Sequence, residues 1–341
     1  MKRINLTFLL ILFVFALSAC GSTADIAENE ASDYEFSVGI CFDTFVIERW
    51  QKDRDVLVSQ IRDEGGEVIV QNANGDINEQ IEQMEYLINK KVDVIIVVAI
   101  DNYSLSGTIK KAKDEGIKVI SYDRLCLNSN CDLYITFDNE LVGTLLGKNL
   151  ADAVGDRANV IVLNGSPTDN NVQMVHDGFM DEAEVHHFNI LDEIYIDNWD
   201  ADLAYEYVNE NIDTVKKADG IMCGNDAVAT QVIRALSEYR LNDDIVVVGQ
   251  DADLDACQHI VEGLQYMTVY KNVNDLAKEA ARYAVAMAGG NDIEVNRTIN
   301  DGGYDVPYVA MTPDAVTAQN IDAVIIDGGF HTQDEVYLNV R

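Results

Sequence analysis

Basic residues and proline are both scarce in this chain of 341 residues. It has 24 Lys and Arg against 59 Asp and Glu, a formal net charge of −35 at pH 7, and only 3 prolines. A chain this acidic does not favour nucleic acid or anionic lipid, because both bind basic surfaces. The small number of prolines leaves long helices and strands uninterrupted. The expected partner is therefore neutral or basic, and nucleic acid is not expected.

Signatures of catalysis and of metal binding are also missing. The sequence has no Cys/His spacing of the zinc kind, no glycine-rich phosphate loop and no G-x-S-x-G. Its five histidines do not combine with a nucleophile and an acid at a spacing typical of a catalytic triad. The acids of residues 251–262 imitate a calcium loop, but Ala256 stands where the sharp turn needs glycine, so we interpret this segment as the start of a helix. We predict no enzyme, no metal and no cofactor, with an enzyme of the doubly wound class as the alternative.

The N-terminus reads as an export signal. Lys2 and Arg3 precede an apolar run of twelve residues, Leu6 to Leu17, which is too short to span a bilayer and fits the core of a secretory signal. Leu17-Ser-Ala-Cys20 resembles the lipobox of bacterial lipoproteins, in which the cysteine carries the lipid. An ordinary cleaved signal or a short anchor is the alternative. We expect residues 1–20 to be a lipoprotein signal peptide and residues 21–34, which are small, polar and acidic, to be a flexible tether.

Five further cysteines follow Cys20. Cys126 and Cys131 bracket a probable loop, and an exported chain could oxidise them, so their pairing stays open. Cys41, Cys223 and Cys257 lie in or beside apolar segments, where a buried thiol is expected.

Short Val/Ile-rich runs alternate with longer segments of helical period from residue 36 onward. Continuous apolar strands separated by helices predict parallel sheets covered on both faces. The length is sufficient for two packed cores. The expected strands are 36–43, 67–74, 92–100, 118–124, 133–139, 159–166, 188–196, 220–226, 244–251 and 265–271.

Several of these strands end in polar or charged residues, namely Asp123, Arg124, Asp138, Asn139, Asn225, Asp226, Gln250, Asp251 and Lys271. In open α/β sheets, ligands bind beyond the carboxyl ends of the strands. Paired donors and acceptors with charges of both signs suit an uncharged ligand that presents many hydroxyls. An Asp or Asn at the start of a helix could instead be its N-cap, and this alternative applies to Asn139, Asp226 and Asp251.

Ordered motifs along the chain carry a family resemblance. They are "ERWQKDRD" (48–55), "VQNANG" (70–75), "VISYDR" (119–124), "TFDNE" (136–140), "NGSPTDNN" (164–171), "GND" (224–226), "VVGQDADL" (247–254) and "MTVYK" (267–271). Together they resemble the bacterial D-xylose-binding proteins of ABC transporters, which belong to the ribose- and galactose-binding type of periplasmic binding proteins. The similarity runs from about residue 34 to beyond residue 327.

The resemblance implies a fold of two Rossmann-like lobes with parallel sheets, joined by a three-segment hinge. The N-terminal lobe is expected to hold residues 35–138 and 272–300, and the C-terminal lobe residues 139–271 and 301–341. The chain is expected to cross between lobes near 137–139, near 270–272 and within 300–307, where glycines ease hinge dihedrals.

The resemblance also implies a set of ligand-binding residues. The two tryptophans suit the C–H face of a sugar ring, the cations donate hydrogen bonds, and the carboxylates and amides accept them. A tryptophan could equally be a core residue. The expected set is Arg49, Trp50, Asp123, Arg124, Asn139, Asn170, Asn171, Trp199, Asn225, Asp226, Asp251 and Lys271.

The function that follows is capture of a monosaccharide, with D-xylose as the expected sugar, and its delivery to an ABC transporter. The lipobox and tether, which the family pattern does not require, suggest retention on the outer face of a membrane. A sensory subunit for a membrane histidine kinase or chemoreceptor is the alternative. A transcription regulator shares the fold but would need a basic helix-turn-helix head where this chain has its signal segment.

Overall fold

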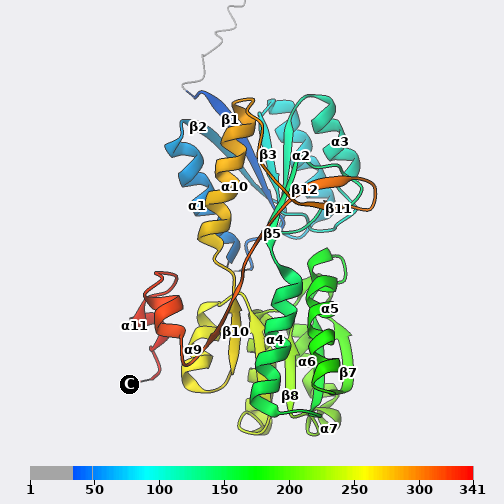
Figure 1. Ribbon diagram of the computed structural model, residues 1–341, viewed down its shortest axis with the longest axis vertical. Coiled ribbons are helices and arrows are strands. Elements are labelled where there is room, and N and C mark those ends of the chain that lie inside the picture. Colours follow the sequence, from blue (N-terminus) through cyan, green and yellow to red (C-terminus); the bar gives the residue numbers. More distant parts are fainter. Residues whose placement is uncertain (1–33, 48, 341) are drawn as a thin grey trace, which may run out of the picture. The chain divides into compact units, whose positions relative to one another are not determined.

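The described residues form two α/β lobes, each built on a mostly parallel sheet with helices on both faces (Figure 1). The computed structural model describes residues 34–47 and 49–340. The expected signal peptide, its Cys20 and the tether up to residue 33 lie outside the described residues. The predicted fold class, with ten strands near the expected positions, is confirmed.

The first sheet has the strand order β11-β12-β5-β4-β3-β1-β2, and all its neighbours run parallel except β11 and β12. Central strands such as β3 are buried along their whole length, as expected for a sheet covered on both faces. The strands are β1 (Phe36–Phe42), β2 (Gly66–Asn72), β3 (Val94–Val97), β4 (Lys118–Tyr122), β5 (Leu133–Phe137), β11 (Thr298–Asn300) and β12 (Asp305–Met311).

The second sheet has the order β13-β10-β9-β8-β6-β7 and is parallel apart from β13, which runs antiparallel to β10. In both sheets the strand order reverses beside the first strand of the lobe, between β1 and β3 and between β6 and β8, which is where such sheets bind ligands. The strands are β6 (Asn159–Asn164), β7 (Asn189–Tyr195), β8 (Gly220–Cys223), β9 (Val246–Gln250), β10 (Met267–Tyr270) and β13 (Asp314–Thr317).

Amphipathic helices cover both faces of the first sheet. On one face α1 (Arg49–Asp63) packs against α10 (Val273–Ala288), whose alanines allow a close approach. The other face is covered by α2 (Ile77–Lys90) and α3 (Ser106–Asp114). Because α10 follows a strand of the second sheet yet packs on the first, the two lobes are interwoven in sequence.

The second sheet is covered in the same way. One face packs against α4 (Asn139–Val154) and α5 (Asn170–Val185). These two helices meet at Gly143 and Gly178, where an added Cβ would lie 1.9 Å and 2.0 Å from backbone oxygens of the facing helix. The other face carries α6 (Asp202–Glu210), α7 (Ile212–Val215) and α8 (Asp226–Tyr239). The remaining elements are a 3-10 turn (Asp197–Trp199), α9 (Leu254–Glu262), a π-helical turn (Asp322–Ile326) and α11 (Gln333–Val336).

Within the described residues, the chain passes between the lobes after β5, after β10 and after β12. The expectation that the third crossing lies within 300–307 is wrong. Strand β12 pairs in parallel with β5, so residues 305–311 extend the first sheet, and the crossing follows at Thr312 and Pro313, just before β13. The sequence reading also omitted β11, β12 and β13, which are strands at or next to the sheet edges.

Candidate ligand-binding site

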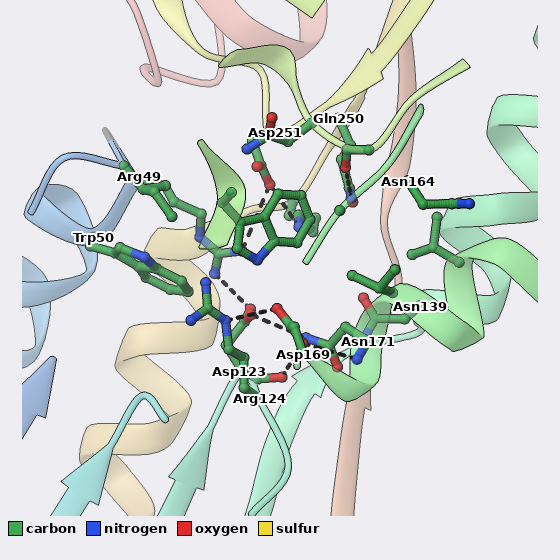
Figure 2. Close-up of a pocket in the computed structure, with 18 of the residues that line it drawn as sticks. Arg49, Trp50, Asp123, Arg124, Asn139, Asn164, Asp169, Asn171, Gln250 and Asp251 are labelled. Carbon is green, nitrogen blue, oxygen red and sulfur yellow. Dashed lines mark hydrogen bonds and ion pairs between the residues drawn. The ribbon is translucent and has the colours of Figure 1, made fainter. Parts of the chain in front are cut away.

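A cavity lies where strand ends of both sheets meet the start of α1 and α5, with an empty volume of about 520 Å³. This volume includes space that is open to solvent. Its lining combines three cations with three carboxylates, so the formal charges balance. Figure 2 shows two of the cations, Arg49 and Arg124, and the carboxylates of Asp123, Asp169 and Asp251. The lining residues are Ile47, Arg49, Trp50, Asp123, Arg124, Asn139, Asn164, Gly165, Asp169, Asn171, Val172, Val175, Trp199, Met222, Gly224, Asn225, Gln250, Asp251 and Lys271.

Arg49, at the start of α1, is the cation that joins acids from both lobes. Its Nη2 lies 2.8 Å from Oδ2 of Asp123, and its Nη1 lies 3.8 Å from Oδ1 of Asp251. One turn along α1, Oδ1 of the buried Asp53 lies 3.6 Å from Nη2 of Arg49 and accepts a hydrogen bond from the Tyr122 hydroxyl. Only 3% of Arg49 is exposed, so this guanidinium is held by its acidic partners rather than by solvent.

Arg124 makes the second cross-lobe ion pair. Its Nη1 donates to Oδ2 of Asp43 at 2.7 Å and to the carbonyl oxygen of Ala99 at 3.0 Å, both in the first lobe. Its Nε lies 2.8 Å from Oδ2 of Asp169, which immediately precedes α5 of the second lobe. Asp123 and Arg124, which follow β4, therefore face different partners. Asp123 adopts a left-handed backbone conformation (φ 64°), which turns the chain between them.

Burial and charge act differently on the carboxylates of this site. Burial by itself would raise the pKa of Asp123, but the charges of Arg49, Lys271 and Arg124 outweigh it and hold that pKa below its usual value. Burial raises the pKa of Asp43 and of Asp169 despite the opposing charge of Arg124. Asp123 thus ionises more easily than Asp43 or Asp169, as suits an acceptor for ligand hydroxyls.

The second lobe supplies amides and an ion pair. Asn171 donates from Nδ2 to the backbone oxygen of Asp123 at 2.9 Å and accepts from the Tyr134 hydroxyl at 2.9 Å. Nζ of Lys271, directly after β10, lies 2.6 Å from Oδ1 of Asp251, directly after β9. These contacts bring the ends of β4, β9 and β10 to one cavity.

The two tryptophans take different positions in the lining. Trp50 belongs to the core of the first lobe as well as to the cavity, and the Arg49 guanidinium stacks 4.3 Å from its ring centroid. Trp199 lies against Gly165, where an added Cβ would come within 2.0 Å of the indole Cη2. Only a glycine at position 165 leaves room for this indole.

Some buried polar atoms of the lining have no hydrogen-bond partner among the described residues. They are Nε1 of Trp199 and of Trp50, Nε of Arg49 and Oε1 of Gln250. Buried polar groups are normally paired, and each exception requires an explanation. Donors and acceptors left free around one cavity are suited to a polar ligand.

Asn170 and Asp226 are the two members of the expected set that do not line the cavity. Oδ1 of Asn170 accepts from the backbone N–H of Leu125 at 2.7 Å, so this side chain joins the lobes beside the site. Asp226 is fully buried behind the cavity and accepts from Thr268 and Gln265. The structure brings all the other expected residues to the lining.

Sequence reasoning missed several charged or polar members of the site. Asn164 and Gly165 end a strand or follow it, so the strand-end rule could have selected them, whereas Gln250 was recognised at a strand end but not included in the expected ligand set. Asp169 lies in a motif that was recognised, but its side chain was not assigned to the site. Asp53 gave no signal in the sequence beyond its spacing of four from Arg49 on a helix.

Metal-binding and cysteine chemistry do not add to the site. In residues 34–47 and 49–340, no group of three or more His, Cys, Asp or Glu side chains is arranged to hold a metal ion. The calcium-like segment 251–262 leads into helix α9. Cys126 and Cys131 are free, buried thiols, as are Cys41 and Cys223, and Cys257 is also buried.

Comparison with known proteins agrees with this architecture. The profile of the periplasmic binding protein domain matches residues 38–292. The chain belongs to this family. Over 318 residues it is 39% identical to the D-xylose-binding periplasmic protein of Haemophilus influenzae, covering 92% of this chain and 95% of that protein. Over 311 residues it is 38% identical to the protein of the same name from Escherichia coli, covering 89% and 93%.

A solved structure is similar across both lobes. An ABC transporter solute binding protein from Clostridium phytofermentans with bound β-D-glucose is 27% identical, with a TM-score of 0.81 and coverage of 88% of this chain and 99% of that one. The relatives of this periplasmic binding protein are solute-binding proteins, not enzymes. Across the described part of the chain, no helix has the length and apolar character needed to cross a bilayer.

Proposed function

We propose that this protein captures a monosaccharide, with D-xylose as the expected sugar, in the cavity between its two lobes. The observation that carries the proposal is the charge-balanced lining, in which ion-paired side chains from both sheets surround unpaired polar atoms. A charged ligand would leave one sign of charge uncompensated in a buried site, which is costly. A neutral ligand with several hydroxyls leaves the balance unchanged and can pair with the free atoms.

The sugar class is supported by the tryptophans and by the relatives. Indole faces suit the C–H faces of a pyranose, and both Trp50 and Trp199 lie in the lining. The relatives of 39% and 38% identity are named for binding D-xylose. A pentose lacks the exocyclic carbon of a hexose, so a closely packed cavity would favour it.

Binding would stabilise the approach of the lobes. Three residue pairs already form contacts between the lobes: Arg124 with Asp169, Asn171 with Asp123, and Asn170 with Leu125. A ligand that contacts both sets of strand ends gains all its interactions only when the lobes are together, so it shifts the population towards that form.

We also propose that the protein is anchored by lipid at Cys20 and delivers its sugar to an ABC transporter. Support for the anchor is the sequence Leu17-Ser-Ala-Cys20 after the apolar run. Support for delivery is the similarity to transporter solute-binding proteins. Signalling to a membrane histidine kinase or chemoreceptor is the competing role, and co-purification of the full-length protein with a permease or with a sensor separates the two.

Calorimetric titration of residues 21–341 with D-xylose, D-ribose, L-arabinose, D-glucose and D-galactose tests the ligand. We expect D-xylose to bind, to be recovered unchanged, and to raise the melting temperature by mass action. Binding of another of these sugars without D-xylose would show that the expected sugar is wrong. Absence of binding by every sugar would reject the proposed function.

A further inference from the structure

The backbone that presents Asp251 to the cavity is strained. Asp251 has φ 107° and Ala252 has φ 55°, and neither is a glycine. Such conformations cost free energy and persist only where the surroundings hold them, which is common at functional sites. This backbone conformation directs the Asp251 carboxylate towards Lys271 and Arg49 at the cavity. The backbone N–H of Asp251 donates to the carbonyl oxygen of Val269 at 2.9 Å, and His331 Nε2 lies 2.8 Å from the carbonyl oxygen of Ala252, so contacts outside the cavity also hold this turn.

Asp226 is the side chain at the centre of that support. Its Oδ2 accepts from the backbone N–H of Asp253 at 3.2 Å and from Oγ1 of Thr268 at 2.7 Å. The Thr268 hydroxyl oxygen in turn accepts from the backbone N–H of Ala252 at 3.1 Å. Two successive amides of the strained turn are therefore tied, directly or through one hydroxyl, to one buried carboxyl group.

The surroundings of Asp226 are shaped to hold it there. Its Oδ1 accepts from Nε2 of Gln265 at 2.8 Å, and none of its residue surface is exposed. At Gly249, an added Cβ would lie 2.3 Å from this same Oδ1, so β9 leaves space for the carboxyl group only because it has glycine there. Helix capping does not explain Asp226, because Asn225 caps α8 by accepting from the backbone N–H of Val228 at 2.9 Å.

We infer that Asp226 is a positioning residue for sugar recognition, which holds the turn at 251–253 so that Asp251 faces the ligand. This inference rests on the proposed function. Asp226 itself contacts no ligand, in contrast to the role that the sequence predicted for it. Asp226 affects sugar affinity only by fixing the position of the Asp251 carboxylate.

A double-mutant cycle on D-xylose affinity tests the inference. Asp226→Ala removes both acceptor atoms and should weaken binding on the order of 10-fold, within the range of coupling between contacting residues. In an Asp251→Ala background the same substitution should change affinity little, because no carboxylate remains to be positioned. An equal loss in both backgrounds, or no loss in either, would overturn the inference.

A conservative variant and a second site separate positioning from general damage. Asp226→Asn keeps an acceptor of the same shape and should restore most of the affinity. Thr268→Val breaks the other connection to the turn and should repeat the loss and its dependence on Asp251, which keeps the test decisive even if Asp226→Ala does not fold. Retention of full affinity by Thr268→Val would count against the network.

The matched control is Glu140→Gln, an exposed acid in the first turn of α4. Its affinity should equal that of the unmodified protein. The two proposals fail in different ways. If the unmodified protein binds none of the sugars, the proposed function fails. If it binds D-xylose and Asp226→Ala binds equally well, only the positioning role fails.

Discussion

Replacing Asp169 with Asn should weaken sugar binding without weakening the unliganded fold. Asp169 and Arg124 are each 5% exposed, belong to different lobes, and are joined at 2.8 Å. A hydrogen bond to a charged group contributes about 1.5–3 kcal/mol net. Because burial raises the pKa of Asp169 in spite of Arg124, desolvation offsets part of the attraction, so we expect the lower end of that range. A loss of about 1.5 kcal/mol corresponds to roughly 10-fold weaker binding.

The substitution isolates the ion pair because Asn can still cap α5. Oδ1 of Asp169 accepts from the backbone N–H of Asn171 at 3.0 Å, and Asn caps helices as well as Asp does. Titration calorimetry with D-xylose measures the affinity, and urea unfolding without sugar measures the stability. Asp76→Asn is the matched control, since Asp76 caps α2 in the same way but does not line the cavity. Equal affinities for the unmodified protein and Asp169→Asn would refute the idea that this pair contributes to closure on the ligand.

Two further predictions concern the pH dependence of stability and the contact between Gly165 and Trp199. Burial, with a contribution from the charge of Asp251, raises the pKa of Asp226 to about 8, so its stabilising contribution is complete below the unfolded pKa near 4 and is lost as pH rises towards 8. The difference in unfolding free energy between the unmodified protein and Asp226→Asn should therefore fall as the pH rises from about 4 to about 8. A difference that stays constant over this range would contradict the raised pKa of Asp226. Gly165→Ala should displace the Trp199 indole, lower sugar affinity and shift tryptophan fluorescence, because the new methyl group would lie 2.0 Å from Cη2. Unchanged emission together with unchanged affinity would show that the indole does not depend on this glycine.

The strands and most helices of both lobes were predictable because their signal is local. Runs such as residues 94–97, which are buried along their whole length, are apolar at every position, and α2 shows an apolar stripe at helical spacing. Strands β11, β12 and β13 were not found. Strand β11 is mostly exposed and, like β13, pairs antiparallel with one neighbour, so it carries neither a continuous apolar run nor a strong alternation. The third crossing was misplaced for the same reason, since it depends on β12 joining the first sheet.

The polar ends of strands indicated the place of the site but not the direction of each side chain. Asn225 and Asp226 are neighbours at the end of β8, yet one lines the cavity and the other lies behind it. Adjacent residues at a helix start point in different directions, and only the packing of Thr268 and Gln265 shows which of the two is turned inward. Capping and ligand binding also use the same residue types, so the sequence could not separate them.

Residue order and composition by themselves determined the alternation of strands and helices, the polar strand ends, the acidic balance and the two tryptophans suited to a sugar. Periodicity and end signals depend on neighbours within a few positions, so they can be read directly. Only the tertiary structure decided that Arg49 joins Asp123 and Asp251, that Arg124 reaches Asp169, and which buried polar atoms stay free. These pairings join segments far apart in the chain, and the strength of a charge contact depends on its distance and burial, which no local pattern specifies.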